Sequence, residues 1–494
     1  MTPKLPTTFP RRAWLKAALA GTASLGVASL SRRGVALERT PKFLIVIGAN
    51  GGASIIDSFL AIRHSECNDA DNINCFPDEQ VIGFAGSPLR AVDLALPTTG
   101  PLPFPLDARQ SDFVRKYQSE MLVVPLRHSS VNHLVGQQRA ITGNNAWLGR
   151  TLQECVALEY GQSAAMPNIN MSALGFAERG RDQSIPPKYV AESVTQPKSW
   201  PLSLHGSKGV RGAPAPTLID SARRLRNAAL EEPSAFQRTF GGSRALSRWR
   251  EQRQLAAELE SQDLIERLML MADDPVQTPL SAFGLRGGPD YERMRRALPN
   301  VEVDPMEAQA ALSFALLKAR VASTTTIWPT DRLLIAGETA LLNPPLAFDF
   351  SHSIHRPTQA AVWSRVLRVL DGLITLLRGE PLDATSGASL WDHTLIYVAT
   401  EFGRSKNRLG RSENFGSGHD LNNGVLLISP LLRGNRVLGG VDPHTGLTFG
   451  VDPATGIPDP GRENTEGQLF ASILDTLEVD TTGSGLPPPL PLRR

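Results

Sequence analysis

The sequence is poor in cysteine and in aromatic residues. Only three of its 494 residues are cysteines, and 6% are aromatic. No two cysteines have the CxxC spacing, which argues against a cysteine-based metal site. Cys67 and Cys75 close a short loop rich in Asp and Asn, so they are candidates for a local disulfide. Cys155 is then the odd thiol, and we expect it to be buried.

Long hydrophobic runs are also missing after residue 36. A membrane-spanning helix needs about 20 consecutive apolar residues, so we expect residues 37–494 to contain no membrane span. The Gly-rich segment 48–57 lacks the GxGxxG spacing of a dinucleotide site. Residues 37–494 carry 45 Lys and Arg against 49 Asp and Glu, a net charge of −4, which argues against a nucleic-acid-binding protein.

The N-terminus has the organisation of a twin-arginine export signal. Residues 1–16 are basic without an acidic residue, and Arg11-Arg12 is followed by Ala-Trp-Leu-Lys, close to the twin-arginine pattern. A mildly apolar stretch (17–30) and small residues up to Ala36 complete the signal, and we predict cleavage after Ala36. The pattern predicts export by the twin-arginine translocase to the periplasm or beyond. An uncleaved membrane anchor is the alternative, although the apolar stretch is short.

Short apolar runs alternate with helical patterns along the rest of the chain. This alternation predicts an α/β fold with a mostly parallel central sheet flanked by helices. Residues 217–300 are largely charged and helical in period, which predicts a helical insertion with solvated faces. The Pro-rich tail 481–494 is expected to be disordered. The predicted strands are 43–47, 121–126, 324–328, 394–399 and 425–428, and the predicted helices are 137–158, 305–321, 358–377 and 466–477.

Polar clusters follow several of these strands, where α/β sheets bind their ligands. One Asp and two His within residues 349–355 suit a divalent metal such as zinc or manganese. Helix capping explains Ser130 and Asn132 equally well, and the cations of 404–411 suit either a phosphate or sulfate site or an ordinary solvated loop. The candidate catalytic residues are Ser130, Asn132, His133 and Arg404, and the candidate metal ligands are Asp57, Asp349, His352, His355, Glu401, His419 and Asp420.

The same segments resemble motifs of a known family, the domain of unknown function 1501. That family is sulfatase-like and belongs to the alkaline phosphatase superfamily. The motifs occur in the family's order from about residue 42 to 480, and EFGRS at 401–405 is the most specific of them. Gly51–Phe59 resembles GGPSxxDTF, Asn132-His133 with Thr142-Gly143 resembles NH…TG, Phe348-Asp349 with His352 resembles WDTH, Glu401–Ser405 resembles EFGRT, Gly418–Asp420 resembles RDH, and Gly439–Asp442 resembles GxTD.

The resemblance implies an alkaline-phosphatase-like domain over residues 37–480 with one or two divalent metal ions (zinc, manganese or calcium). Arg404 is implied to support the site or the anion. The implied metal ligands are Asp57, Asp349, His352, Glu401 and His419.

Three departures from the family motifs leave alternatives open. The segment from Asp349 to His352 is one residue longer than WDTH, so His355 is an alternative ligand. The Asp–His order is reversed at 418–420, which makes Asp420 a further candidate. His133 stands where a nucleophilic Thr or Ser is expected, and the neighbouring Ser and Asn side chains are out of register.

Two functional hypotheses follow. The first is an exported metal-dependent hydrolase of phosphate or sulfate esters, acting on an anionic small-molecule or polymer ester. The second is a non-catalytic binding or scaffold protein that keeps the fold.

Overall fold

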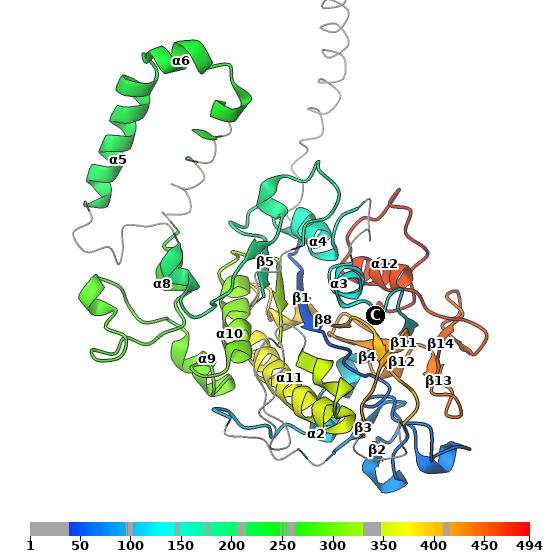
Figure 1. The fold of residues 1–494 in the computed structure, drawn as a ribbon. Helices are drawn as coiled ribbons and strands as arrows, with labels where there is room; N and C mark the ends of the chain where they lie inside the picture. Colours follow the sequence, from blue (N-terminus) through cyan, green and yellow to red (C-terminus); the bar gives the residue numbers. More distant parts are fainter. Residues whose placement is uncertain are drawn as a thin grey trace, which may run out of the picture. The chain divides into compact units, whose positions relative to one another are not determined.

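An eight-stranded sheet forms the centre of the fold (Figure 1). Its strand order is β12-β4-β11-β8-β1-β7-β5-β6. The strands are β1 (Phe43–Ala49), β4 (Met121–Arg127), β5 (Asn168–Met171), β6 (Glu192–Ser193), β7 (Thr324–Ile327), β8 (Thr394–Thr400), β11 (Asn422–Ile428) and β12 (Arg436–Val437).

The computed structural model describes residues 39–494 with several gaps. The predicted export signal over 1–36 lies outside the described residues. Residues Lys42–Arg494 form one compact unit. The gaps are 95, 97–101, 144–148, 173–177, 205–213, 248, 251–252, 254–261, 330–346 and 409–414.

One strand of the sheet runs against the others. β11 is antiparallel to both of its neighbours, β4 and β8, whereas the other pairs in the sheet are parallel. The prediction of an α/β fold with a mostly parallel sheet is therefore confirmed. As a consequence, the carboxyl ends of β1, β4, β7 and β8 share one edge of the sheet with the amino end of β11.

Helices cover both faces of the sheet because its strands are apolar on both sides. In β1, Ile45 and Ile47 belong to one apolar cluster and Leu44 and Val46 to another, as expected from the alternation of side chains along a strand. The first cluster contains buried residues of α10 (Pro305–Lys318) and α11 (His355–Arg378). The second contains residues of α4 (Leu152–Tyr160) and α12 (Glu466–Thr476).

Most predicted strands and helices match observed ones to within a few residues. Residues 137–158 differ, because a π-helix (Gln137–Ile141) and α4 are separate elements. The remaining helices are α2 (Gln110–Tyr117), α3 (His133–Gly136), α5 (Pro216–Leu225), α6 (Ala235–Phe240), α8 (Leu264–Arg267) and α9 (Tyr291–Ala297), and the small strands are β2 (Val81–Gly83), β3 (Arg90–Val92), β9 (Gly403–Arg404), β10 (His419–Asp420), β13 (Gly440–Val441), β14 (Thr448–Val451) and β15 (Pro458–Asp459).

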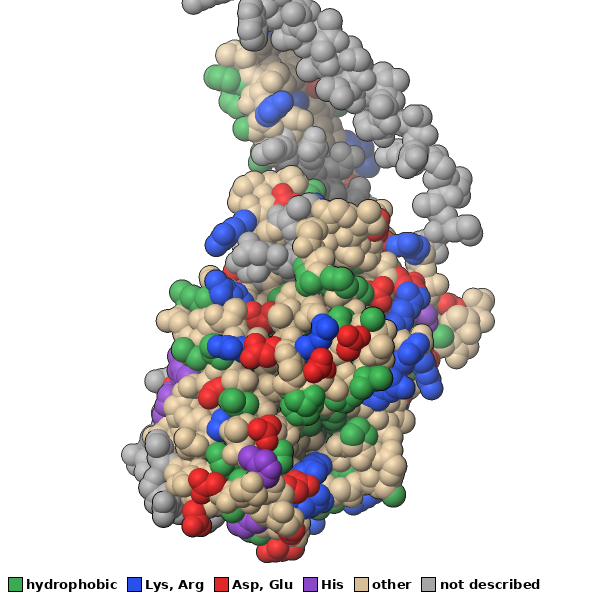
Figure 2. Space-filling view, turned by 90° about the vertical axis from the view of Figure 1, so that its right-hand side faces the viewer, with side chains coloured by type: hydrophobic (Ala, Val, Ile, Leu, Met, Phe, Trp, Pro, Cys, Tyr) green, Lys and Arg blue, Asp and Glu red, His purple; other side chains and the backbone are tan. Residues whose placement is uncertain are grey.

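All three thiols are free. Cys155 is buried, as expected, and Cys67 and Cys75 are unbonded neighbours in one small apolar cluster. Burial raises the pKa of the Cys75 thiol to about 11. Within the described part of the chain, no helix has both the length and the apolar character needed to cross a bilayer. On the face shown in Figure 2, basic and acidic side chains are interspersed.

The tail differs from the expectation of disorder. Leu490 and Leu492 are buried in the apolar cluster of α12, and the amide of Leu490 donates to the hydroxyl of Ser472 at 2.7 Å. Residues two apart in an extended chain point to the same side. The Leu-Pro-Leu spacing therefore presents both leucines to the core, a pattern that the proline content of the segment conceals.

We expect Leu492→Ala to lower the free energy of unfolding by about 2–4 kcal/mol, because it leaves a cavity under the tail. Urea unfolding monitored by circular dichroism measures the change. Leu447→Ala, at a leucine that is 45% exposed, is the control and should cost less than about 0.5 kcal/mol. Equal effects of the two changes would contradict the packed tail.

Candidate metal centre

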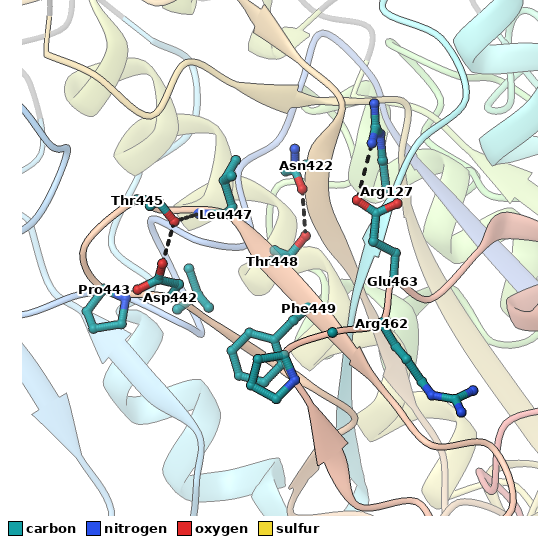
Figure 3. Close-up of a pocket in the computed structure, with 13 residues that line it drawn as sticks. Arg127, Asn422, Asp442, Pro443, Thr445, Leu447, Thr448, Phe449, Arg462 and Glu463 are labelled. Carbon is teal, nitrogen blue, oxygen red and sulfur yellow. Dashed lines mark hydrogen bonds and ion pairs between the residues drawn. The ribbon is translucent and has the colours of Figure 1, made fainter.

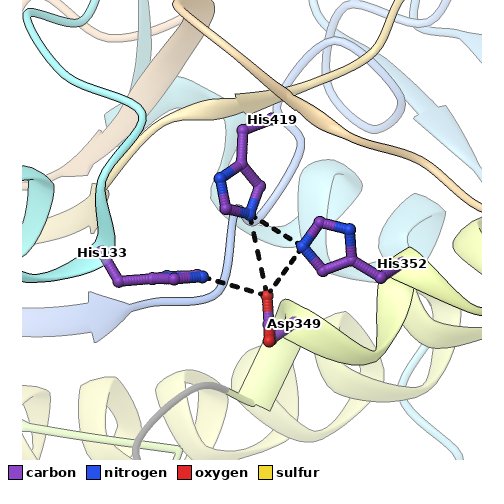
Figure 4. A group of neighbouring side chains, drawn as sticks. All are labelled: His133, Asp349, His352 and His419. Atoms are coloured by element: carbon purple, nitrogen blue, oxygen red, sulfur yellow. Dashed lines mark hydrogen bonds and ion pairs between the residues drawn. The ribbon is translucent and has the colours of Figure 1, made fainter.

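Three histidines and one aspartate converge at the edge of the sheet defined above (Figure 4). Each side chain offers one ligand atom, and the four atoms lie within 4.8 Å of one another. The Nε2 atoms of His133 and His352 are each 3.3 Å from Oδ1 of Asp349, and Nε2 of His419 is 3.9 Å from it. This group, His133, Asp349, His352 and His419, can hold a metal ion and is called the His/Asp cluster below.

Local structure explains how distant segments supply these side chains. His133 is the first residue of α3, six residues beyond the end of β4 at Arg127. Asp349 and His352 lie on a 3-10 helix (Ala347–His352), which has three residues per turn, so that residues three apart share one face. His419 lies on β10, which pairs with β9 and leads into β11.

The outer nitrogens of two imidazoles are anchored. Nδ1 of His133 lies 2.7 Å from Oε1 of Glu401, and Nδ1 of His419 lies 2.8 Å from the carbonyl oxygen of Val131. Oε1 of Glu401 also accepts a hydrogen bond from the amide of Gly51 at 2.7 Å. Protein zinc sites hold their histidines in this way, because the outer bond fixes the ring and its tautomer. In the neutral form of each ring, Nε2 is therefore the atom that can offer a lone pair to a metal ion at the centre.

The spacing of the ligand atoms fits a tetrahedral metal ion. Zinc–nitrogen bonds of about 2.0 Å place tetrahedral ligand atoms roughly 3.3 Å apart, and the separations from Asp349 are 3.3 to 3.9 Å. The Nε2 atoms of His352 and His419 are 2.8 Å apart, so one of them must accept and hence be unprotonated. The donor set of imidazoles and one carboxylate is typical of zinc and its neighbours.

Arg404 ties the loops of the site together. Its guanidinium is fully buried and donates to the carbonyl oxygens of Ser417 at 3.0 Å and Phe348 at 3.3 Å, and also to that of Gly51. It lies 3.3 Å from Oδ1 of Asp349. Gly51 has φ +83°, and a side chain there would come within 2.4 Å of the amide of Asp349, so the close approach of these loops requires glycine.

The charges of the site shift the pKa values of its members. Burial raises the pKa of Asp349, but His133, His419 and Arg404 outweigh burial and hold it well below its usual value. Burial likewise lowers the pKa of His133, yet the carboxylates of Asp349 and Glu401 raise it to about 9. Burial and the nearby Arg404 lower the pKa of His352. Asp349 is thus ionised at neutral pH, and His133 holds a proton when no metal is bound.

Four of the candidate residues from the sequence meet in the cluster. Asp349, His352 and His419 were expected as metal ligands, and His133 was expected as a catalytic residue. Glu401 was expected as a ligand, but it lies behind His133, fully buried, and its Oε2 makes no hydrogen bond within the described structure.

Asp57 and His355 lie together but outside the cluster. Nε2 of His355 is 2.7 Å from Oδ2 of Asp57, and Asn74 donates to the other carboxylate oxygen at 2.7 Å. Burial opposes ionisation of Asp57, but the contact with His355 keeps its pKa below the usual value. His355 begins the long helix α11 and points away from His352 into this pair, so it does not replace His352 as a ligand.

The remaining candidates make local contacts. Ser130 accepts a hydrogen bond from the amide of Asn132 at 3.1 Å, and Asn132 caps α3 by accepting from Val135 at 3.2 Å. Asp420 accepts from the amide of Asn422 at 2.7 Å. Helix capping therefore accounts for Asn132, whereas Ser130 makes a local turn contact beside the cap.

The basic loop 404–411, for which the sequence leaves an anion site and a solvated loop open, holds neighbouring segments in place. Lys406 donates to the carbonyl oxygens of Arg404 at 3.0 Å and Asn422 at 2.7 Å. Arg408 donates to the carbonyl oxygen of Ala70. Arg411 lies outside the described residues.

Comparison of the chain with protein-family models and with curated proteins found no match. The assignment of the site therefore depends on its geometry and on the resemblance of its motifs.

We expect the purified protein to bind one zinc ion per chain, and His352→Ala or His419→Ala to weaken binding at least about a hundredfold, because each removes a ligand atom. Competition with a chromophoric chelator measures the affinity. His444→Ala, at an exposed histidine, is the matched control. Unchanged affinity in the cluster variants would contradict the site.

Zinc affinity should rise about tenfold per pH unit between pH 7 and about 9, because the ion must displace the proton that His133 holds below its raised pKa. The same titration of His133→Gln should give a weaker site with little pH dependence over this range. An equal slope in both proteins would show that another group releases the proton.

Proposed function

We propose that this protein is an exported, metal-dependent hydrolase of phosphate or sulfate esters with an alkaline-phosphatase-like fold. The observation that carries the proposal is the His/Asp cluster at the ligand-binding edge of an α/β sheet. A bound divalent ion would act there as a Lewis acid toward an ester oxygen and lower the pKa of water. The twin-arginine signal supports export to the periplasm or beyond.

The charge balance of the site suits an anionic ester. Asp349 and Glu401 are the carboxylates in contact with the imidazoles, and the guanidinium of Arg404 offsets one of them. A divalent ion would make the centre net positive, which attracts an anion in a partly dehydrated site. Glu401 keeps the proton of His133 on Nδ1, so that Nε2 stays available at the centre.

The cluster is open to solvent on the side of His352, whose side chain is 45% exposed. Val131 and Leu134, two and one residues from His133, are exposed apolar residues. They supply a nonpolar surface for the organic part of an ester beside the ligands.

A cavity of about 1080 Å³ lies where β4 ends and β11 begins (Figure 3). Arg127 and Asn422, which are register partners of β4 and β11, lie in its wall. Phe449 and Leu447 provide apolar lining, and Asn422 follows His419 by three residues. We assign this cavity to the distal part of a large or polymeric ester.

One observation favours the non-catalytic binding protein as the second candidate. The hydroxyls nearest to His133 in the chain are engaged elsewhere: Ser129 donates to Glu466 at 2.5 Å, and Ser130 accepts from Asn132. Hydrolysis would then depend on water rather than on a side-chain nucleophile.

The test is hydrolysis of p-nitrophenyl phosphate and p-nitrophenyl sulfate by the zinc- or manganese-loaded protein. We expect Asp349→Asn to abolish turnover, and Glu401→Gln to reduce kcat/KM about 10–100-fold because it releases the His133 ring. Asp420→Asn, outside the cluster, is the matched control and should retain activity. Metal binding without turnover of either ester in the wild-type protein would support the binding protein instead.

A further inference from the structure

Residues 216–250 form a segment with an unusual surface, called the helical arm below (Figure 1). It contains α5, a π-helical turn (Arg226–Glu231), α6 and the start of a further helix. Residues 248 and 251–252 are not described. The functional site uses no residue of the arm.

The apolar face of α5 points to solvent. Leu218, Ala222 and Leu225 recur at intervals of four and three residues, so they share one face of the helix. Leu218 and Leu225 are 61% and 60% exposed, and Ala222 is exposed too. Asp220 and Arg224 occupy the opposite side of the helical wheel. A surface helix of a globular protein normally buries this face against the core.

Aromatic side chains are exposed to solvent on the rest of the arm. Phe236 and Phe240 lie one turn apart on α6, with ring centroids 5.1 Å apart, and both are more than half exposed. Trp249 is 48% exposed, and the guanidinium of Arg253 lies over its ring at 3.9 Å. Exposed apolar groups of this size, grouped on one segment, mark an interaction surface.

The charge of the arm is strongly positive and carried only by arginine. Residues 216–250 contain seven arginines and no lysine against three carboxylates. Glu231 forms a two-bond ion pair with Arg253, at 2.5 and 2.7 Å, and lies 3.4 Å from Arg226 and 3.9 Å from Arg250. Arg224 and Arg238 donate to neutral acceptors, the Ser221 hydroxyl and the Pro233 carbonyl, so their charges are not neutralised there.

We propose that the helical arm docks on an anionic lipid surface. Leucine, phenylalanine and tryptophan side chains enter the interface between headgroups and acyl chains, and arginines contact the lipid phosphates. The positive charge favours this partner over a second copy of the chain, because two arms of like charge repel each other. The proposed hydrolase centre would then work beside a membrane, although the described part of the chain contains no membrane-spanning helix.

Vesicle co-sedimentation tests the proposal with the full chain and with residues 37–494, which contain the compact unit Lys42–Arg494. The probes are phosphatidylcholine vesicles with and without about 30 mol% phosphatidylglycerol. We expect both chains to bind the anionic vesicles at least about tenfold more tightly than the neutral ones, and added salt to weaken binding.

The variant Leu225→Ser/Phe240→Ser should lose at least about tenfold in affinity for anionic vesicles. Val276→Ser/Ile457→Ser, at two exposed apolar residues outside the arm, is the matched control and should bind like the wild type. Zinc content and the thermal unfolding midpoint should be unchanged in both variants, which separates this test from that of the hydrolase.

Three results would overturn the proposal. Binding that disappears when residues 1–36 are removed would belong to the N-terminal segment. Unchanged binding in Leu225→Ser/Phe240→Ser would show that the arm is not the contact. Conversion of a dimer to a monomer by the same variant, with no vesicle binding by the wild type, would assign the apolar face to a second copy.

Discussion

The buried guanidinium of Arg404 joins the loops that carry the His/Asp cluster. It bonds to backbone carbonyls of three segments, at Gly51, Phe348 and Ser417, and it touches the carboxylate of Asp349. A planar guanidinium with five donors can bond to three carbonyls and a carboxylate at once, whereas a lysine ammonium has only three donors. Backbone hydrogen bonds join the same segments: the amide of Phe348 donates to the carbonyl oxygen of Asn50 at 3.1 Å, and the amide of Ser417 donates to that of Ser351 at 2.8 Å.

The antiparallel direction of β11 has a consequence for the ligand set. Because β11 begins at the edge where β4 and β8 end, the segment that precedes it contributes His419 to the site. Three chain segments, which carry His133, Asp349 with His352, and His419, thus meet at one place although they are far apart in the sequence. Glu401 contacts Nδ1 of His133, and the carbonyl oxygen of Val131 contacts Nδ1 of His419. These contacts turn the Nε2 atoms of both rings toward the centre of the cluster. The centre is organised before any metal binds.

The charged side chains of the His/Asp cluster and those of the helical arm lie in different surroundings. At the His/Asp cluster, the carboxylates of Asp349 and Glu401 each have a cationic or hydrogen-bonding partner. The helical arm exposes arginines beside apolar side chains. Exposure of apolar side chains to water is unfavourable, and contact with a membrane interface would remove them from water. The two features involve different residues, so loss of one should leave the other intact.

The sequence by itself determined the α/β class, the five main strands and the segments that carry the chemistry, because apolar runs and polar clusters are local patterns. It could not decide which polar residues share a site. His352 and His355 are three residues apart, yet one faces His419 and the other faces Asp57. A 3-10 helix ends between them and α11 begins, and that turn is set by tertiary packing. The burial of Leu490 and Leu492 could not be predicted for the same reason. These leucines pack against α12, and the local sequence of the tail does not show that this helix lies beside it.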